Sequence, residues 1–415
     1  MRRAGRLWCG AAVAFAVLAA FPGCTAHKPK PTSAARTAQG DAIVATARDF
    51  LAKNNLRAIL LRVTVDGKDV ATEALGTSLD GVPATTAMRF RNGAVAFAYI
   101  STLLLRFVDE KKVGLDDPVE RWMPTLPEAG KVTLRMLANH TSGYPDYETY
   151  PEFQRAFYAD PFQPWPYERR LGYAFSRPQV SAPGTNWSYA HTNFMILGEI
   201  LAKVGGKPLD VLLRERVLAP MGLTHTTATD TGAIPEPVLH AYTSERRGAL
   251  GIAAQTAFSE ESTFWNADWG TPTGASQTTT IEDLDRTAIA VGTGKLLSPS
   301  SYHAMTDQSL LGFGQKLDTC VPSCFTQVTG YNYGLGVVRS GNWLLQNPLL
   351  GGYAATMAYL PAGKVAISVA VTFLPGAFDC DGRYPNLSDA LFRLIGQSMA
   401  PQDAPPPAPA HVRAC

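Results

Sequence analysis

The sequence has almost no excess of charge of either sign. Its 37 lysines and arginines nearly balance its 35 acidic residues, which leaves a formal net charge of +2, so it lacks the basic surface typical of nucleic-acid binding. No apolar run is long enough for a standard transmembrane span. No internal repeat, glycine-rich phosphate loop or zinc-type spacing of His, Cys and Asp is present. We therefore expect no nucleic-acid partner, no metal site and no cofactor.

The N-terminus has the pattern of a bacterial lipoprotein signal. Three arginines stand among the first six residues, and the apolar run Leu7 to Phe21 ends at Pro22-Gly23-Cys24. A small residue before a cysteine, directly after such a run, predicts a signal peptide over 1–23 and a diacylglycerol on the Cys24 sulfur. An uncleaved anchor or a signal without lipid is the alternative. We expect an exported protein, held at the outer face of the membrane through this lipid.

The rest of the chain has the composition of a globular protein with a sizeable core, being 46% hydrophobic and 17% charged. Residues 24–40 are polar and contain proline, which indicates a tether. A domain is predicted over 41–399, followed by a Pro/Ala-rich tail over 400–415. Apolar periodicity predicts helices over 41–54, with Asp41 as N-cap, and over 387–399. Strands are predicted over 58–65, 68–74, 331–338, 343–346, 353–360 and 365–373.

Four cysteines follow Cys24, and in an exported chain they suggest disulfides. Cys320 and Cys324 enclose a short Val-Pro-Ser loop, so we predict that they pair. Cys380 and Cys415 remain, and the sequence alone does not fix their pairing. These bonds are interpreted as staples of loops, with no catalytic role.

A long apolar helix is predicted from Ala94 to Glu110, after the stretch Phe90-Arg91-Asn92-Gly93. Together with Thr133 to Gly143 (TLRMLANHTSG) and Ala219 to Leu223 (APMGL), this stretch resembles the serine β-lactamase and penicillin-binding-protein family, of the class C and DD-peptidase-like kind. The resemblance covers about 41–399. It implies an α/β fold, with an antiparallel sheet flanked by helices and a helical or irregular subdomain over about 110–290 across a cleft.

The family's first catalytic motif, Ser-x-x-Lys, is lost. Its serine attacks a carbonyl and its lysine helps to remove the serine proton. Here Ala94 stands at the serine position and Phe97 at the lysine position. A methyl group cannot attack a carbonyl, and a phenyl ring cannot accept a proton. Ser276, in a segment that the resemblance places near the cleft, is the nearest alternative nucleophile, but no base stands at a telling spacing from it.

The second and third motifs are altered as well. The family's Tyr-x-Asn corresponds to Tyr189-Ala190-His191. These residues are residual catalytic candidates, since imidazole can act as a base near neutral pH, or they are simply hydrogen-bonded residues of the cleft. The family's Lys/His-x-Gly corresponds to Gln346-Asn347-Pro348. Gln346 is neutral, and Pro348 has no N–H to donate. We expect all these positions, with Ala94 and Phe97, to line the cleft.

Three functions follow as hypotheses. The first is a pseudoenzyme of this hydrolase family that binds a peptidoglycan-like peptide, another envelope ligand or a partner protein. The second is an active esterase or peptidase that uses Tyr189 and His191 with an unrecognised nucleophile. The third is an interaction protein with a vestigial cleft, whose partners dock on the aromatic stretch 144–187. The sequence does not indicate an oligomeric state.

Overall fold

A computed structural model describes residues 37–228, 231–275 and 277–407. The chain divides after Ala35 into two units, and the described residues belong to the second. The predicted signal peptide, Cys24, Ser276 and Cys415 lie outside the described residues, as does most of the predicted tether. Within the described part, no helix is both long and apolar enough to cross a membrane.

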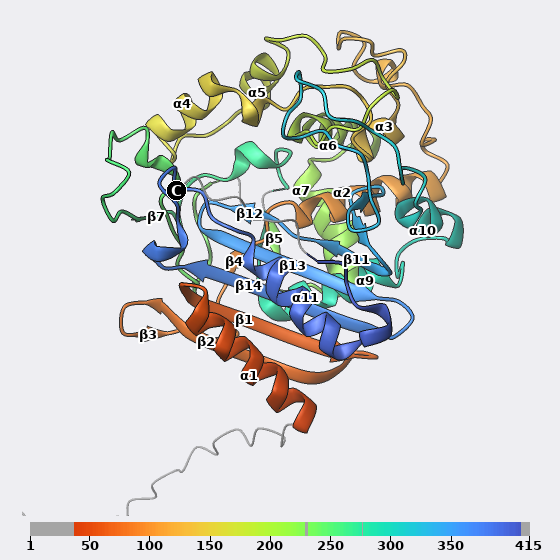
Figure 1. Cartoon of the computed structure of the whole chain (residues 1–415). Helices are drawn as coiled ribbons and strands as arrows, with labels where there is room; N and C mark the ends of the chain where they lie inside the picture. Colours follow the sequence, from red (N-terminus) through yellow and green to blue (C-terminus); the bar gives the residue numbers. More distant parts are fainter. Residues whose placement is uncertain (1–36, 229–230, 276, 408–415) are drawn as a thin grey trace, which may run out of the picture. The chain divides into compact units, whose positions relative to one another are not determined.

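Nine strands of the described chain form one antiparallel sheet in the order β3-β2-β1-β14-β13-β11-β10-β9, with β12 paired to β13 (Figure 1). Its strands are β1 Leu56–Val65, β2 Lys68–Leu79, β3 Val82–Pro83, β9 Asn332–Tyr333, β10 Val338–Ser340, β11 Trp343–Gln346, β12 Leu349–Leu350, β13 Tyr353–Leu360 and β14 Val365–Phe373. Short strands outside this sheet are β4 Phe90–Arg91, β5 Thr227–Ala228 and β8 Gln277–Thr279, which pair together, and β6 Tyr242–Thr243 with β7 Glu260–Glu261.

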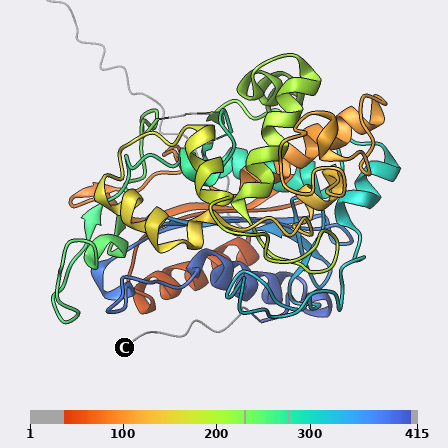
Figure 2. The same ribbon diagram turned by 90° about the horizontal axis from the view of Figure 1, so that it is seen from above.

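Helices cover both faces of this sheet (Figure 2). On one face lie α1 Ala38–Lys53 and α11 Leu387–Met399. The other helices are α2 Val95–Asp109, α3 Leu134–Ala138, α4 Pro151–Ala159, α5 Tyr167–Ala174, α6 His191–Gly205, α7 Leu209–Leu213, α8 Ala219–Met221, α9 Ile281–Gly292 and α10 Pro299–Thr306. The predicted α/β fold with an antiparallel sheet is therefore confirmed. The helices and loops between 110 and 290 form one unit with the sheet.

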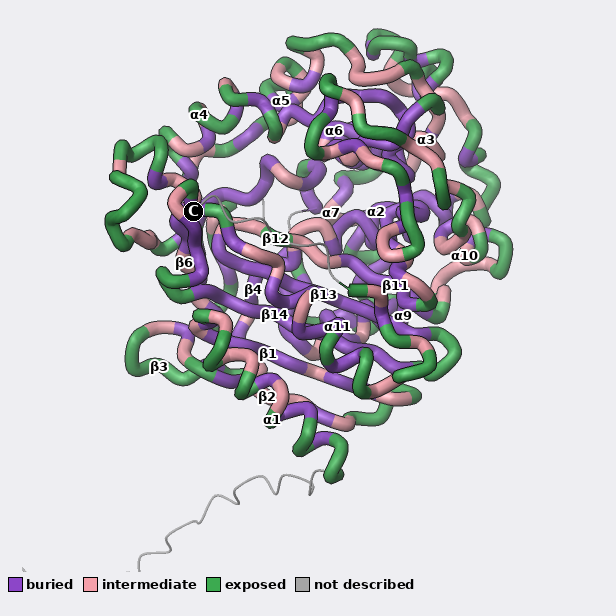
Figure 3. Tube along the Cα trace, viewed as in Figure 1, coloured by how far each residue is buried: buried purple, intermediate pink, exposed green. Residues whose placement is uncertain are grey.

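The central strand β14 lies between two hydrophobic cores, and its two faces carry side chains of different size. Its large residues, such as Ile367 and Val371, face α1 and α11, while its small residues Ala366 and Ala370 face the core built around α2. Small side chains let the covering helices approach the sheet closely. Twelve of the 15 residues of α2 are buried, and Figure 3 shows this helix and the central strands mostly in the colour of buried residues.

The predicted elements agree with the structure except at particular residues. Helix α1 begins at Ala38, capped by the Thr37 hydroxyl, so the Asp41 cap was wrong. The predicted strand 331–338 is broken, because Gly336 adopts φ +70° and a Cβ there would lie 2.5 Å from the Phe97 carbonyl oxygen. The chain bends at this point to pass over the start of α2. The predicted Cys320–Cys324 disulfide is present. Cys380 is also disulfide-bonded.

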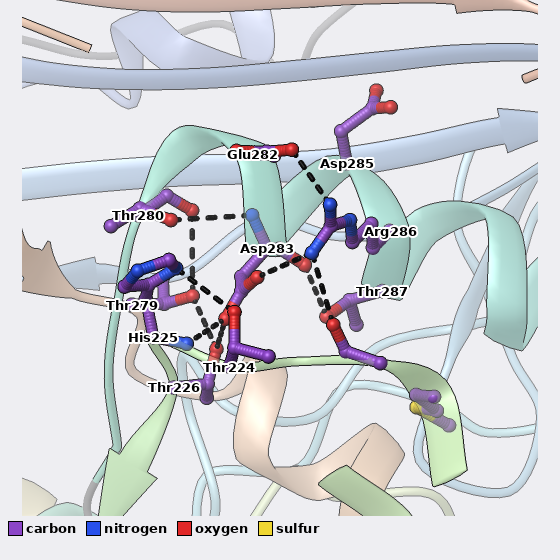
Figure 4. Close-up of polar contacts among 12 residues, drawn as sticks. Thr224, His225, Thr226, Thr279, Thr280, Glu282, Asp283, Asp285, Arg286 and Thr287 are labelled. Atoms are coloured by element: carbon purple, nitrogen blue, oxygen red, sulfur yellow. Dashed lines mark hydrogen bonds and ion pairs between the residues drawn. The ribbon is translucent and has the colours of Figure 1, made fainter. Parts of the chain in front are cut away.

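A buried aspartate fastens the segment before β5 to helix α9 (Figure 4). Asp283 is fully buried. Its Oδ2 accepts the His225 N–H at 2.6 Å and the Thr226 hydroxyl at 3.0 Å, while the Thr280 hydroxyl caps the helix by accepting the Asp283 N–H at 3.3 Å. The carboxylate satisfies the Thr226 hydroxyl, which is buried away from water.

We expect Asp283→Ala to lower the free energy of unfolding by about 2–4 kcal/mol, because two donors lose their charged acceptor. Glu282→Ala is the matched control, since the Glu282 side chain is half-exposed and forms an ion pair with Arg286. Its expected cost is below about 1 kcal/mol. Urea unfolding of both variants measures the difference, and equal losses would contradict the assigned role of Asp283.

Candidate functional site

The start of α2 is set by a tight turn against the opposite strand. Gly93 has φ +47°, and a Cβ on it would lie 2.7 Å from the Pro348 Cβ, so this turn requires glycine. Ala94 follows as the N-cap residue and offers no side-chain cap. The turn brings the position of the family's serine directly beside the position of its third motif.

The altered motifs meet around a single cavity of about 320 Å³. Ala94 comes from the start of α2, His191 from the start of α6 and Gln346 from the end of β11. Tyr189, Asn347 and Pro348 line the same cavity, together with Gly93, Glu148, Ala267, Trp269, Gly270, Thr271, Tyr331, Leu349 and Leu350. The structure therefore brings together residues up to 257 positions apart in sequence, counted from Gly93 to Leu350. This volume is within the range of small-molecule sites.

Phe97 does not line this cavity, contrary to expectation. It is fully buried and stacks on Phe194 of α6, with ring centroids 3.9 Å apart and planes inclined by 4°. The Tyr189 and His191 rings lie farther away, at 6.1 Å each. Packing the Phe97 ring against α6 removes its apolar surface from water, which is more favourable than exposing it in the wall of the cavity. The position of the lysine has thus become part of the core.

Among the described residues, no lysine or arginine lines the cavity beside Tyr189. Burial first, and then the nearby Tyr333 and Tyr331 hydroxyls, raise the pKa of Tyr189 well above its ordinary value. The Asp146 and Glu148 carboxylates act in the same direction. The phenol therefore keeps its proton at neutral pH. A tyrosine in this state is a hydrogen-bond donor to a ligand rather than a base.

His191 is held by two carboxylates. Its Nδ1 lies 3.2 Å from both Asp146 carboxylate oxygens and 3.1 Å from Glu148 Oε2, and its backbone N–H donates to Asp146 Oδ1 at 3.2 Å. Burial disfavours the charged ring, but the two carboxylates outweigh it and raise the pKa of His191 to about 9. At neutral pH the residue is an imidazolium, so it is not the free base that the sequence suggested.

Asp146 and Glu148 were missed in the sequence analysis. They follow the phrase Asn139 to Gly143 as a pair of acids two residues apart, a weak signal without the tertiary contact to His191. Among the described residues, these three form the group whose ligand atoms, all within 4.8 Å of one another, could share a metal ion. The imidazolium proton already bridges the carboxylates, and a metal would have to displace it.

The third motif is engaged in structural contacts. Gln346 is buried, and its Nε2 donates to the Gly336 carbonyl oxygen at 2.7 Å. Asn347 Nδ2 donates to Asp389 Oδ1 at 3.2 Å. Strand β11 ends at Gln346, and pairing with β13 resumes at Leu349, because Pro348 cannot donate to the ladder. At the position of the family's Lys or His, Gln346 therefore has a neutral amide that already donates to the Gly336 carbonyl oxygen.

Two further polar residues of the family phrases are structural. His140 is fully buried; burial and the charge of His191 hold its pKa well below the ordinary value, so it stays neutral and accepts the Ala190 N–H at 3.2 Å. Ser142 is also buried, and its hydroxyl donates to Asn193 Oδ1 at 2.5 Å. Neither residue lines the cavity. Ser142 is therefore no substitute nucleophile.

Comparison with known proteins agrees with this geometry. The sequence matches the Beta-lactamase family over residues 43–391. The chain belongs to the β-lactamase family. This confirms the resemblance drawn from the motifs, and it places the protein among β-lactamase-related serine hydrolases.

Individual relatives of this β-lactamase-family protein are distant. It is 26% identical over 163 residues to penicillin-binding protein 4* of Bacillus subtilis (strain 168), a stretch that covers 38% of this chain and 34% of that protein. It is 30% identical over 134 residues to the D-alanyl-D-alanine-carboxypeptidase/endopeptidase AmpH of Escherichia coli (strain K12), covering 31% and 34%. The chain thus spans about a third of the length of these curated relatives.

Solved structures show the same fold. The D-amino acid amidase from Ochrobactrum anthropi SV3, complexed with D-phenylalanine, aligns with a TM-score of 0.71 and 21% identity, over 86% of this chain and 98% of that one. A D-stereospecific amidohydrolase from Streptomyces aligns with a TM-score of 0.66 and 23% identity, over 80% and 94%. At this level of identity the likeness concerns the fold alone.

We expect Phe97→Ala to lower the free energy of unfolding by about 3–5 kcal/mol, because it empties a fully packed site between α2 and α6. Phe162→Ala is the matched control: Phe162 is 60% exposed, and its loss should change stability by less than about 0.5 kcal/mol. Chemical denaturation reports both values. A small loss for Phe97→Ala would mean that the ring is not a packing residue.

The ion group around His191 gives a pH dependence whose sign is fixed. The pKa of His191 is raised to about 9 in the folded state, above its ordinary value near 6.5. Its stabilising contribution is therefore fully present below pH ~6.5 and is lost as the pH rises through about 9. We expect the stability of Asp146→Asn to fall less over this range than that of the wild type. Thermal unfolding between the two pH limits, with an NMR titration of His191, tests this, and parallel curves would refute it.

Proposed function

We propose that this β-lactamase-family protein works at the cell envelope by binding a small peptide-like ligand, without forming an acyl-enzyme. The observation that supports this most is the cavity itself. It has a volume of about 320 Å³ and is lined by residues of all three motifs, yet Ala94 presents a methyl group where the nucleophile would stand. A vestigial site with no ligand would be free to fill with side chains, as protein interiors generally do.

The charges around the cavity also favour binding over acyl transfer. Within the described residues, no lysine or arginine lines the cavity. Acyl transfer needs a base for the nucleophile and donors for the oxyanion. Phe97 is packed into the core, Tyr189 keeps its proton and His191 is already charged.

A peptide-like ligand is proposed from the relatives' names and from the lining. The curated relatives include a D-alanyl-D-alanine-carboxypeptidase/endopeptidase and a penicillin-binding protein. The cavity combines apolar walls, such as Leu350 and Trp269, with polar groups at Tyr189 and Asn347. Such a mixture suits the alternation of side chains and amides in a short peptide. The envelope location rests on the lipoprotein pattern at Cys24, which remains a prediction.

The two other hypotheses receive less support. A hydrolase would need an activated nucleophile. Burial raises the pKa of both Tyr189 and Tyr331, the two phenols that line the cavity, and the nearby His191 is already charged. An interaction protein was expected to dock partners on the aromatic stretch 144–187. Docking on this stretch stays a prediction, and it receives less support because five of its rings, including Phe153 and Trp165, are buried in one cluster.

The test exposes the full-length protein to a fluorophosphonate, a labelled penicillin and an activated ester, and separately to peptidoglycan peptide fragments. We expect no covalent adduct and no turnover, since no serine stands at position 94. We expect the fragments to raise the melting temperature through preferential binding to the folded state. A specific adduct would overturn the binding-only function.

A matched pair of variants assigns the binding to the cavity. Ala94→Phe places a ring in the cavity and should abolish the thermal shift. Ala42→Phe, on the exposed face of α1 across the sheet, should leave the shift unchanged. Both variants must unfold cooperatively without ligand. Equal shifts in the two variants would show that the ligand binds elsewhere.

A further inference from the structure

A smaller compartment of about 70 Å³ adjoins the cavity. It shares Glu148, Trp269, Leu349 and Leu350 with the cavity lining, so the two spaces are neighbours along one wall. Its own walls come from helix α4 and from the turn after β6. No family motif contributes to the residues that it adds.

Aromatic rings form one side of this compartment. Phe153, Phe157 and Tyr158 of α4 line it together with Trp269. The Phe157 ring centroid is 5.5 Å from that of Trp269 and 5.1 Å from that of Tyr158, so the rings support one another. Aromatic faces carry partial negative charge and attract cations, ammonium groups in particular.

Two carboxylates form the other side. Glu148 and Glu245 both line the compartment, and no basic residue of the described chain does. The arginines next to Glu245 point to other partners: Arg246 Nε binds Glu260 Oε1 at 3.0 Å, and Arg247 donates to the Ala254 carbonyl oxygen at 3.0 Å. Glu148 is paired with His191 on the cavity side. The charge of Glu245 is thus left without an ion-pair partner among the described residues.

The pKa of Glu245 shows that a charged carboxylate is unfavourable at this position. Burial raises its pKa to about 7, an interaction with the Tyr384 hydroxyl works against this, and the charge of Glu148 raises it further. The Tyr384 hydroxyl also accepts the Gly352 N–H at 2.7 Å, which fixes the position of the phenol next to Glu245. A second negative charge in so small a space is unfavourable until a cation enters it.

We propose that this compartment binds a primary ammonium group carried by the ligand of the main cavity, between the Glu245 carboxylate and the aromatic rings of α4. The proposal rests on the proposed function, because the ligand is held mainly by the cavity. It assigns a ligand class: a molecule with an amine placed a short distance from its apolar or peptide-like body. A carboxylate at the same place would face two acids and no cation.

Calorimetric titration of the full-length protein with benzylamine, benzyl alcohol and benzoate tests the proposal. We expect benzylamine to bind most tightly and benzoate not to bind. Glu245→Gln should weaken benzylamine binding by at least about tenfold, since it removes a charge-assisted hydrogen bond, and should leave benzyl alcohol unaffected. Glu168→Gln, an exposed acid on α5, is the control and should bind benzylamine as the wild type does.

Each result decides one of the two proposals. Equal benzylamine binding by wild type and Glu245→Gln overturns the ammonium site. Binding of benzyl alcohol or peptidoglycan fragments, with no preference for the amine, also overturns it and leaves the proposed function standing. If neither the fragments nor any probe binds, both proposals fall. Should Glu245→Gln not fold, Tyr158→Leu removes part of the aromatic wall and keeps both acids, and it should weaken benzylamine selectively.

Discussion

The face-to-face contact of Phe97 with Phe194 is the interaction on which the site depends. It joins the first turn of α2 to the first turn of α6, and these two turns carry Ala94 and His191 into the cavity. In an active relative, the resemblance implies, a lysine at position 97 would reach toward the serine. A stacked pair of phenyl rings holds the same two helices together through apolar contact. The two helix starts that line the cavity therefore stay in contact, through Phe97 and Phe194 rather than through a lysine.

The polar groups around the cavity are arranged without the positive charges that the family's motifs would supply. Position 97 holds no lysine and position 346 no cation, and burial keeps Tyr189 protonated. Asp146 and Glu148 instead form ion pairs with His191, which stands at the position of the family's asparagine. Glu245 has no such partner among the described residues and lies against aromatic rings. The cavity region therefore carries more acid than base, which suits a ligand that brings a cation of its own.

Much of the fold could be predicted because its signals are local. The strands 343–346, 353–360 and 365–373 and the helix 387–399 agree with the structure to the residue. The misses are residues that respond to distant contacts. Gly336 breaks a predicted strand because it passes over the start of α2. Asp41 is not the N-cap of α1, because the helix begins earlier and the Thr37 hydroxyl caps it by accepting the Gly40 N–H. The acids at 146 and 148 gave only a weak local signal, because their contact with His191 is tertiary.

The sequence by itself determined that position 94 has no nucleophile, and its motifs indicated the family, because residue identity and spacing carry that information directly. Only the tertiary structure decided which groups are charged and which are buried. It placed Phe97 in the core instead of the wall, made His191 an imidazolium, and set Glu245 beside Glu148 although they are far apart in the chain. Charge and burial depend on neighbours in space, and those neighbours exist only once the chain is folded.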